Sequence, residues 1–212
     1  MRIFKHGHAC VRIETGPHRI VLDPGMFTAP EALDGATTVL ITHEHPDHWT
    51  PGHLRATDAP IVTIAAVARQ IAEQAPDVGE RVRVVAPGDL VDVGVPVEVV
   101  GEKHAVIHPE LPHFDNSGYL LSVDGTTVFH PGDALTMPPA TPDLLLLPVS
   151  APWLKVSECI DYARDVGAKR SLAIHDAVYS DAGLGIVDSH LNRFLGPREQ
   201  EYVRLKAGDE LG

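Results

Sequence analysis

The sequence predicts an α/β protein in which two β-sheets pack together with helices on the outside. Short apolar runs separated by Gly and Pro, 18 of each, recur along the chain and indicate many short elements. Strand patterns come first, and strand and helix patterns alternate toward the end of the chain. Residue types that bind metals follow several of the strands. With 212 residues the chain has the length of one domain, 1–212, with room for a substantial core.

The first half of the chain begins with strands. Residues 2–14 and 19–22 are apolar or alternating on either side of a Gly-Pro turn, which predicts two strands joined by that turn. A helix over 65–74 should end before Pro76, because proline lacks the N–H that a helix interior needs. The other elements expected here are a strand over 38–41, a short helix near 51–56 and a strand over 60–64.

The second half of the chain continues with strands and then alternates. Val-rich runs bounded by Gly and Pro predict strands at 81–85, 90–93 and 95–100. Asp124-Gly125 is a strong hairpin signal, so the runs on either side of it should pair. The elements expected after residue 117 are strands over 118–123, 126–130, 144–149, 170–174 and 202–205, and helices over 156–166 and 186–194.

One loop carries an unusual density of metal-binding residue types. Thr42-His43-Glu44-His45-Pro46-Asp47-His48 places three histidines and an aspartate within six consecutive positions. Imidazole and carboxylate together suit Zn²⁺, and also Mn²⁺ or Fe²⁺. The run directly follows the expected strand over 38–41, and the sequence therefore predicts a metal site at the end of that strand.

Three further residues of this kind also follow expected strands. His104 comes after the strand over 95–100, Asp133 after the strand over 126–130, and His175 after the strand over 170–174. Taken alone, a histidine after a strand is more often a surface residue, and an aspartate after Pro-Gly usually forms a turn. Together with the His43–His48 run, however, the three complete two metal coordination spheres.

Composition excludes several other classes of protein. The net charge of −12 argues against broad, phosphate-driven binding of nucleic acid, which needs a basic face. The two cysteines, Cys10 and Cys159, have no metal-type spacing and are expected to be reduced thiols of a cytoplasmic protein. No signal sequence is apparent, and no apolar run approaches the roughly 20 residues of a membrane helix, so no membrane insertion is expected.

The run from Thr42 to His48 resembles the HxHxDH signature of the metallo-β-lactamase-fold hydrolases, and the resemblance extends over essentially the whole chain. Asp23, in Leu22-Asp23-Pro24-Gly25, is similar to an aspartate that this family places earlier in the chain. His104, Asp133 and His175 follow in the order of the later family motifs. Gly7-His8-Ala9 is most similar to the branch that contains L-ascorbate-6-phosphate lactonase-like proteins and N-acyl-phosphatidylethanolamine phospholipase D.

The resemblance implies a four-layer αββα sandwich with a dinuclear metal site at one edge of the sheets. One ion would be held by His43, His45 and His104, the other by Asp47, His48 and His175, with Asp133 bridging both. The ions are expected to be zinc, with manganese or iron as alternatives. Such a centre activates water, and Asp47 would orient the nucleophile or accept its proton.

The function expected from this centre is hydrolysis of a small soluble ester, lactone or phosphodiester. Two alternatives share the same residues. A nuclease is disfavoured by the net charge, and a non-catalytic metal-binding protein is disfavoured by the completeness of the ligand set. The substrate, the metal and the oligomeric state depend on loop shape, which the sequence does not specify.

Several residues near the predicted ligands have two interpretations. His8 is either a half-buried structural residue or part of the pocket wall, and Trp153 either lines the pocket mouth or caps the core. His130 is expected to be a hydrogen-bonding partner of the ligands. His108 and His113 are expected to be loop residues.

Overall fold

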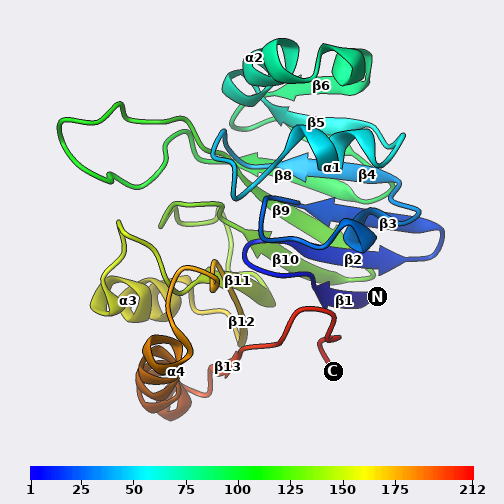
Figure 1. Ribbon diagram of the computed structural model, residues 1–212. Coiled ribbons are helices and arrows are strands. Elements are labelled where there is room, and N and C mark those ends of the chain that lie inside the picture. The colour runs from blue at the N-terminus through cyan, green and yellow to red at the C-terminus, as the bar shows by residue number, and fades with distance from the viewer.

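The computed structural model describes residues 1–212 and contains two β-sheets packed face to face (Figure 1). The first sheet has six strands, in the order β1 (Arg2–Lys5), β2 (Val11–Thr15), β3 (His18–Leu22), β4 (Thr38–Ile41), β5 (Ile61–Ile64) and β6 (Val82–Val85). The second has seven, in the order β13 (Glu201–Val203), β12 (Arg170–Ile174), β11 (Leu144–Pro148), β10 (Thr126–His130), β9 (Gly118–Val123), β8 (Pro96–Val100) and β7 (Leu90–Asp92).

The direction of the strands decides where the loops lie. In the first sheet β1 to β3 are antiparallel and β3 to β6 are parallel. In the second sheet β7 to β10 are antiparallel and β10 to β13 are parallel. Within each sheet, strands that run in the same direction end at the same edge. The loops after β1, β3 and β4, and those after β8, β10, β11 and β12, therefore leave their sheets at shared edges.

Helices cover the outer faces of both sheets. The helices α1 (Pro51–Arg55) and α2 (Ala65–Gln74) share an apolar cluster with the first sheet, and α3 (Val156–Val166) and α4 (Asp181–Leu195) share one with the second. A third cluster, which includes Leu40 and Leu146, lies between the sheets. These layers confirm the αββα sandwich. Three short 3-10 helices complete the chain: Pro30–Leu33, Pro76–Arg81 and Gly196–Arg198.

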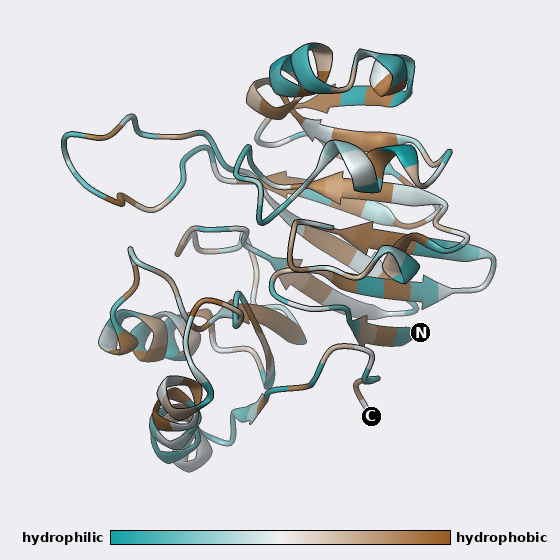
Figure 2. Cartoon of the chain, viewed as in Figure 1, coloured by the Kyte–Doolittle hydropathy of each residue, from teal (hydrophilic) through white to brown (hydrophobic).

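The layering follows the hydropathy of the sequence. Apolar residues concentrate in the strands, and polar residues concentrate on the exposed faces of the helices and in the loops (Figure 2). All five residues of β11 are buried, as expected for a strand covered on both faces. None of the helices combines the length and the apolar character that crossing a membrane requires.

The prediction of one strand over 2–14 is wrong, because the chain turns sharply between β1 and β2. Gly7 and His8 have φ angles of 100° and 47°, in the left-handed region that strands do not use. A Cβ on Gly7 would lie 2.6 Å from the carbonyl oxygen of Phe27, so glycine is required at this position. The turn brings His8 to the edge where the site lies.

The last helix begins earlier than predicted. α4 starts at Asp181 rather than at residue 186, because the hydroxyl of Ser180 accepts a hydrogen bond from the backbone N–H of Gly183 (3.3 Å) and caps the helix. Gly183 and Gly185 have low helix propensity and concealed this first turn in the sequence.

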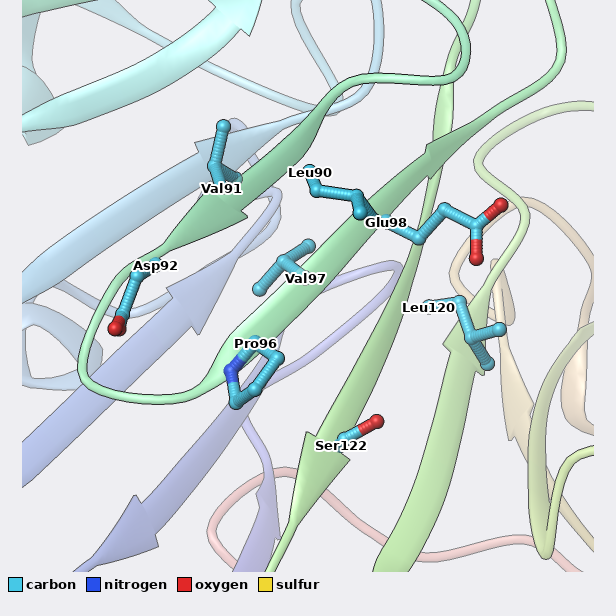
Figure 3. A pocket seen from close by; sticks show the side chains of 8 residues that line it. All are labelled: Leu90, Val91, Asp92, Pro96, Val97, Glu98, Leu120 and Ser122. Carbon is cyan, nitrogen blue, oxygen red and sulfur yellow. The ribbon is translucent and has the colours of Figure 1, made fainter.

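Part of the second sheet has an outer face that is open to solvent. A shallow groove of about 310 Å³ runs over β7, β8 and β9, and the side chains of Leu90, Pro96, Glu98, Leu120 and Ser122 line it (Figure 3). Leu90 is 77% exposed there. The groove contains no histidine and none of the predicted site residues.

Candidate metal centre

The predicted ligands come together at the edge where the loops leave both sheets. They form two groups, and within each group the ligand atoms lie within 4.8 Å of one another. The HxHxDH run is divided between them, since His43 and His45 belong to one group and Asp47 and His48 to the other. The first group is His43, His45, His104 and Asp133, and the second is His8, Asp47, His48 and His175.

Asp133 lies between the two groups. Its Oδ1 is 3.1 Å from Nε2 of His48, and its Oδ2 is 3.0 Å from Nε2 of His175 and 3.4 Å from Nε2 of His104. The carboxylate thus contacts histidines of both groups. Its backbone N–H donates to Oδ1 of Asn116 (3.0 Å), and this hydrogen bond fixes the loop after β10.

Four histidines are anchored through Nδ1. Nδ1 of His48 donates to Oδ2 of Asp23 (2.7 Å), and Nδ1 of His43 donates to the hydroxyl of Thr42 (3.0 Å), which itself donates to Asp23. The other two donate to backbone carbonyls, His104 to Ala105 and His175 to Ser150. With Nδ1 protonated, the lone pair of a neutral ring is on Nε2, the atom that faces the centre of the site.

The residues present fit a bound cation. Nε2 of His48, His104 and His175 and Oδ1 of Asp133 are all buried, and although the three nitrogens lie 3.0–3.4 Å from the Asp133 carboxylate, none of the four atoms makes a hydrogen bond. Such atoms are rare in folded proteins because each one loses its interaction with water. In addition, Nε2 of His43 lies 3.0 Å from Nδ1 of His45, and two nitrogens bound to one tetrahedral zinc ion lie about 3.3 Å apart.

Without a cation the site is a buried network of ion pairs. Burial alone would lower the pKa of His175, but Asp133 outweighs it and raises the pKa to about 9. Burial likewise opposes the protonation of His48, yet Asp133 and Asp23 raise its pKa well above the usual range. Burial would raise the pKa of Asp133, but His175 and His48 hold it well below the usual range. Binding of a metal ion must therefore release protons from these histidines.

His8 is placed to hold Asp47 rather than to bind a metal. Its Nδ1 accepts a hydrogen bond from the backbone N–H of Ala177 (3.1 Å), so the ring proton is on Nε2, which donates to Oδ2 of Asp47 (3.1 Å). Burial lowers the pKa of His8 to about 4, which keeps the ring neutral. The ring is 1% exposed and is therefore a buried partner of Asp47, not an open pocket wall.

His130 and Trp153 both contact the loop that carries Asp133. His130 donates from Nε2 to the carbonyl of Ala9 (3.1 Å) and accepts at Nδ1 from the N–H of Gly132 (3.0 Å), which joins the His8 turn to this loop. Trp153 donates from Nε1 to Oδ2 of Asp133 (3.1 Å). The half-buried Trp153 ring also stands beside His104, with 5.7 Å between ring centroids.

Three partners of the ligands were not anticipated from the sequence. Thr42 anchors the ring of His43 through its hydroxyl, Ser150 accepts from the ring of His175 at its backbone carbonyl and donates from its hydroxyl to the His175 carbonyl (2.6 Å), and Asn116 holds the backbone of Asp133. Each is an ordinary polar residue whose role depends on the neighbour that the fold brings to it. His108 and His113 lie in an irregular loop as expected, and Nε2 of His113 donates to the carbonyl of His104 (2.7 Å).

The site is open on one side. His43, His48, His104, Asp133 and His175 are buried, whereas the Asp47 side chain is 21% exposed and His45 is half-buried. Solvent therefore reaches the site past Asp47 and His45.

Comparison with known proteins agrees with the fold and the site. Residues 2–175 match the family model described as the beta-lactamase superfamily domain. Protein Rv0786c of Mycobacterium tuberculosis is 38% identical over 192 residues, which cover 88% of this chain and 89% of that protein. A UPF0173 metal-dependent hydrolase of Methanosphaerula palustris is 28% identical over 191 residues, with 82% and 83% covered.

Among solved structures, Igni18, a metallo hydrolase from Ignicoccus hospitalis, is similar with a TM-score of 0.71 at 16% identity, covering 99% of this chain and 97% of that one. At this identity the likeness supports the fold alone. The family match and the relative from Mycobacterium tuberculosis go further: the chain belongs to the beta-lactamase superfamily and has the metallo-β-lactamase fold. The narrower branch expected from Gly7-His8-Ala9 stays a prediction.

Proposed function

We propose that this protein hydrolyses a small ester, lactone or phosphodiester with the help of two divalent metal ions, zinc being the expected one. The broader class, a metal-dependent hydrolase of the metallo-β-lactamase superfamily, follows from family membership and from relatives that carry this description. The two-ion centre, its ligands and the substrate classes are our own proposal.

The observation that carries the proposal is the pair of ligand groups joined by one carboxylate. His43, His45 and His104 would hold one ion and Asp47, His48 and His175 the other, with Asp133 shared. When bound, such ions lower the pKa of a coordinated water toward neutrality and stabilise negative charge that develops on the substrate. No serine or cysteine nucleophile is needed.

Asp47 is the residue best placed to act on the nucleophile. Its carboxylate lies on the open side of the site, and Nε2–H of His8 already occupies Oδ2. Oδ1 is therefore the oxygen that can orient an attacking water or accept its proton. His8 acts as a positioning residue, because its hydrogen bond fixes the direction in which Oδ1 points.

The first test is metal content, measured by mass spectrometry on untagged protein and scaled to protein concentration. We expect close to two equivalents of zinc, manganese or iron, and one equivalent fewer in His43→Ala. Hydrolysis by that variant should fall more than about 100-fold, since even the loss of a residue that only supports a ligand costs about 10- to 100-fold. His190→Ala, on α4 away from the site, is the matched control.

Two results would count against the proposal. If the protein takes up no metal even when metal is supplied, the ligand assignment is wrong. If the protein binds two equivalents of metal but hydrolyses no ester, lactone or phosphodiester, the centre is not hydrolytic toward these substrates. The interpretation as a non-catalytic metal-binding protein is then favoured.

A further inference from the structure

A cavity of about 380 Å³ lies directly beside the first ligand group. His104 and Trp153 form the side toward the site, Ala105, Val106 and Leu135 contribute apolar walls, and Lys103, Thr136 and Glu158 line the remaining, polar part. Trp153 also donates to Asp133, so one ring borders both the cavity and the shared carboxylate. The volume suits a short alkyl or aryl group rather than a long chain.

Several exposed apolar side chains lie on loops that leave the sheets at the same edge. The loops after β3, β8 and β12 carry six of the large apolar residues that remain exposed to solvent. These are Met26, Phe27, Val106, Leu111, Val178 and Tyr179. Phe27 is 45% exposed although its ring packs 5.0 Å from the ring of His8, and Val106 is 57% exposed at the cavity. Exposed apolar side chains on the loops around the site suit contact with an apolar ligand.

The lysines at this edge are not free to bind an anion. Each lysine on these loops or strand ends is paired with a carboxylate: Lys5 with Asp176 (2.9 Å), Lys103 with Asp115 (2.5 Å) and Lys155 with Glu158 (3.3 Å). An anionic substrate would thus find no unpaired lysine here, and the bound metal ions would be its main positive partners.

We infer that the substrate is an uncharged carboxylic ester or lactone whose apolar arm occupies the cavity beside Trp153. The inference rests on the proposed function and narrows it, because it selects acyl over phosphoryl transfer. In the reaction, the oxygen of water bonds to the carbonyl carbon, the bond from that carbon to the alcohol oxygen breaks, and the alcohol takes up a proton. The products are an alcohol and a carboxylic acid.

The test compares p-nitrophenyl acetate, butyrate and hexanoate with bis-p-nitrophenyl phosphate on zinc-loaded protein. Each methylene that enters the cavity should raise kcat/KM by about 4-fold until the cavity is full. The phosphodiester should be the poorest substrate. Val106→Asp places a charge in the cavity wall and should remove the gain with chain length, whereas Leu90→Asp, on the groove of Figure 3, should keep it.

A binding measurement separates this inference from the proposed function. Acetamide, butyramide and hexanamide are uncharged carbonyl compounds that resist hydrolysis. Trp153 is half-buried beside the cavity and Trp49 is only 3% exposed, so a change in tryptophan emission reports on Trp153. Emission should respond more strongly to the longer amides, and the response should be absent in Trp153→Phe.

The outcomes are distinct. Ester hydrolysis that rises with chain length in the wild type but not in Val106→Asp supports both the inference and the proposed function. Faster cleavage of the phosphodiester, or ester hydrolysis without dependence on chain length, overturns the inference and leaves the proposed function intact. If nothing is hydrolysed, the proposed function fails, and the binding of the amides then tests the cavity separately. Binding that grows with chain length supports the apolar subsite, whereas equal or absent binding overturns it.

Discussion

Asp23 provides the sharpest test of how the ligands are held. Its carboxylate is fully buried and accepts three hydrogen bonds, from the N–H of Thr42 (2.8 Å), from the hydroxyl of Thr42 (2.7 Å) and from Nδ1 of His48 (2.7 Å). Asp23→Asn preserves the shape, and asparagine tolerates the left-handed backbone that Asp23 adopts at φ 48°. The substitution therefore changes the hydrogen bonds and little else.

The hydrogen bonds of Asp23 indicate how much Asp23→Asn should change stability and metal affinity. Whichever way the new amide is turned, at least one buried N–H or O–H faces its NH₂ group, and an unpaired buried donor costs about 1–3 kcal/mol. His48 also loses a charged acceptor on Nδ1, and loss of such a partner lowers metal affinity by about 10- to 100-fold. The protein should still fold, since domains are typically stable by about 5–15 kcal/mol.

Two measurements on Asp23→Asn check this reasoning. Zinc affinity is measured by competition with a chromophoric chelator, and the stability of the metal-free protein is measured by urea unfolding. Asp58→Asn, at an exposed position, is the control and should match the wild type in both. If Asp23→Asn binds zinc within about twofold of the wild type while losing stability, then Asp23 supports the fold but does not orient His48.

Three further predictions concern the surroundings of the ligands. Trp153→Phe removes the hydrogen bond to Asp133 and should lower the stability of the metal-free protein by about 1 kcal/mol, seen as an earlier urea midpoint; an unchanged midpoint would contradict it. The pKa of His175 is raised to about 9 from an ordinary 6.5, so its protonated form stabilises the metal-free protein fully below pH 6.5, and this stabilisation is lost as the pH rises through 9. Urea unfolding of chelator-treated protein should show this decline, and His175→Gln should reduce it. Lys5 is 1% exposed and forms an ion pair with Asp176, so Lys5→Met leaves the Asp176 carboxylate without its partner. The free energy of unfolding should fall by about 3–5 kcal/mol, and the double variant Lys5→Met, Asp176→Asn should recover part of this loss.

Much of the fold could be predicted because local pattern and tertiary packing agree. The helices over 65–74 and 156–166 and the strands over 38–41 and 170–174 have the predicted bounds. Each has an apolar pattern that its layer buries, with Pro or Gly near its end. The turn at Gly7 and His8 could not be predicted, because a run with alternating apolar residues does not show where the backbone must adopt a left-handed conformation.

The candidate ligands could be recognised in the sequence, but their partners could not. Histidine and aspartate types after strand ends indicate chemistry by themselves. Thr42, Ser150 and Asn116 are common polar residues, and nothing local distinguishes a threonine that anchors a histidine from one exposed to solvent. The pairing of His8 with Asp47 links positions 39 apart in sequence, so only the topology of the first sheet reveals it.

The position of one sheet relative to the other is part of the site itself. Thr42 is fixed from the second sheet, because Ser117 donates its N–H to the carbonyl of Thr42 (3.0 Å) and the hydroxyl of Tyr119 donates to the carbonyl of Ile41 (2.8 Å). Thr42 in turn anchors His43, which comes from the first sheet, whereas Asp133 comes from the second. Each ligand group therefore combines residues from both sheets, so packing between the sheets sets the geometry within each group, and the buried hydroxyl of Tyr119 links that packing to the metal ligands.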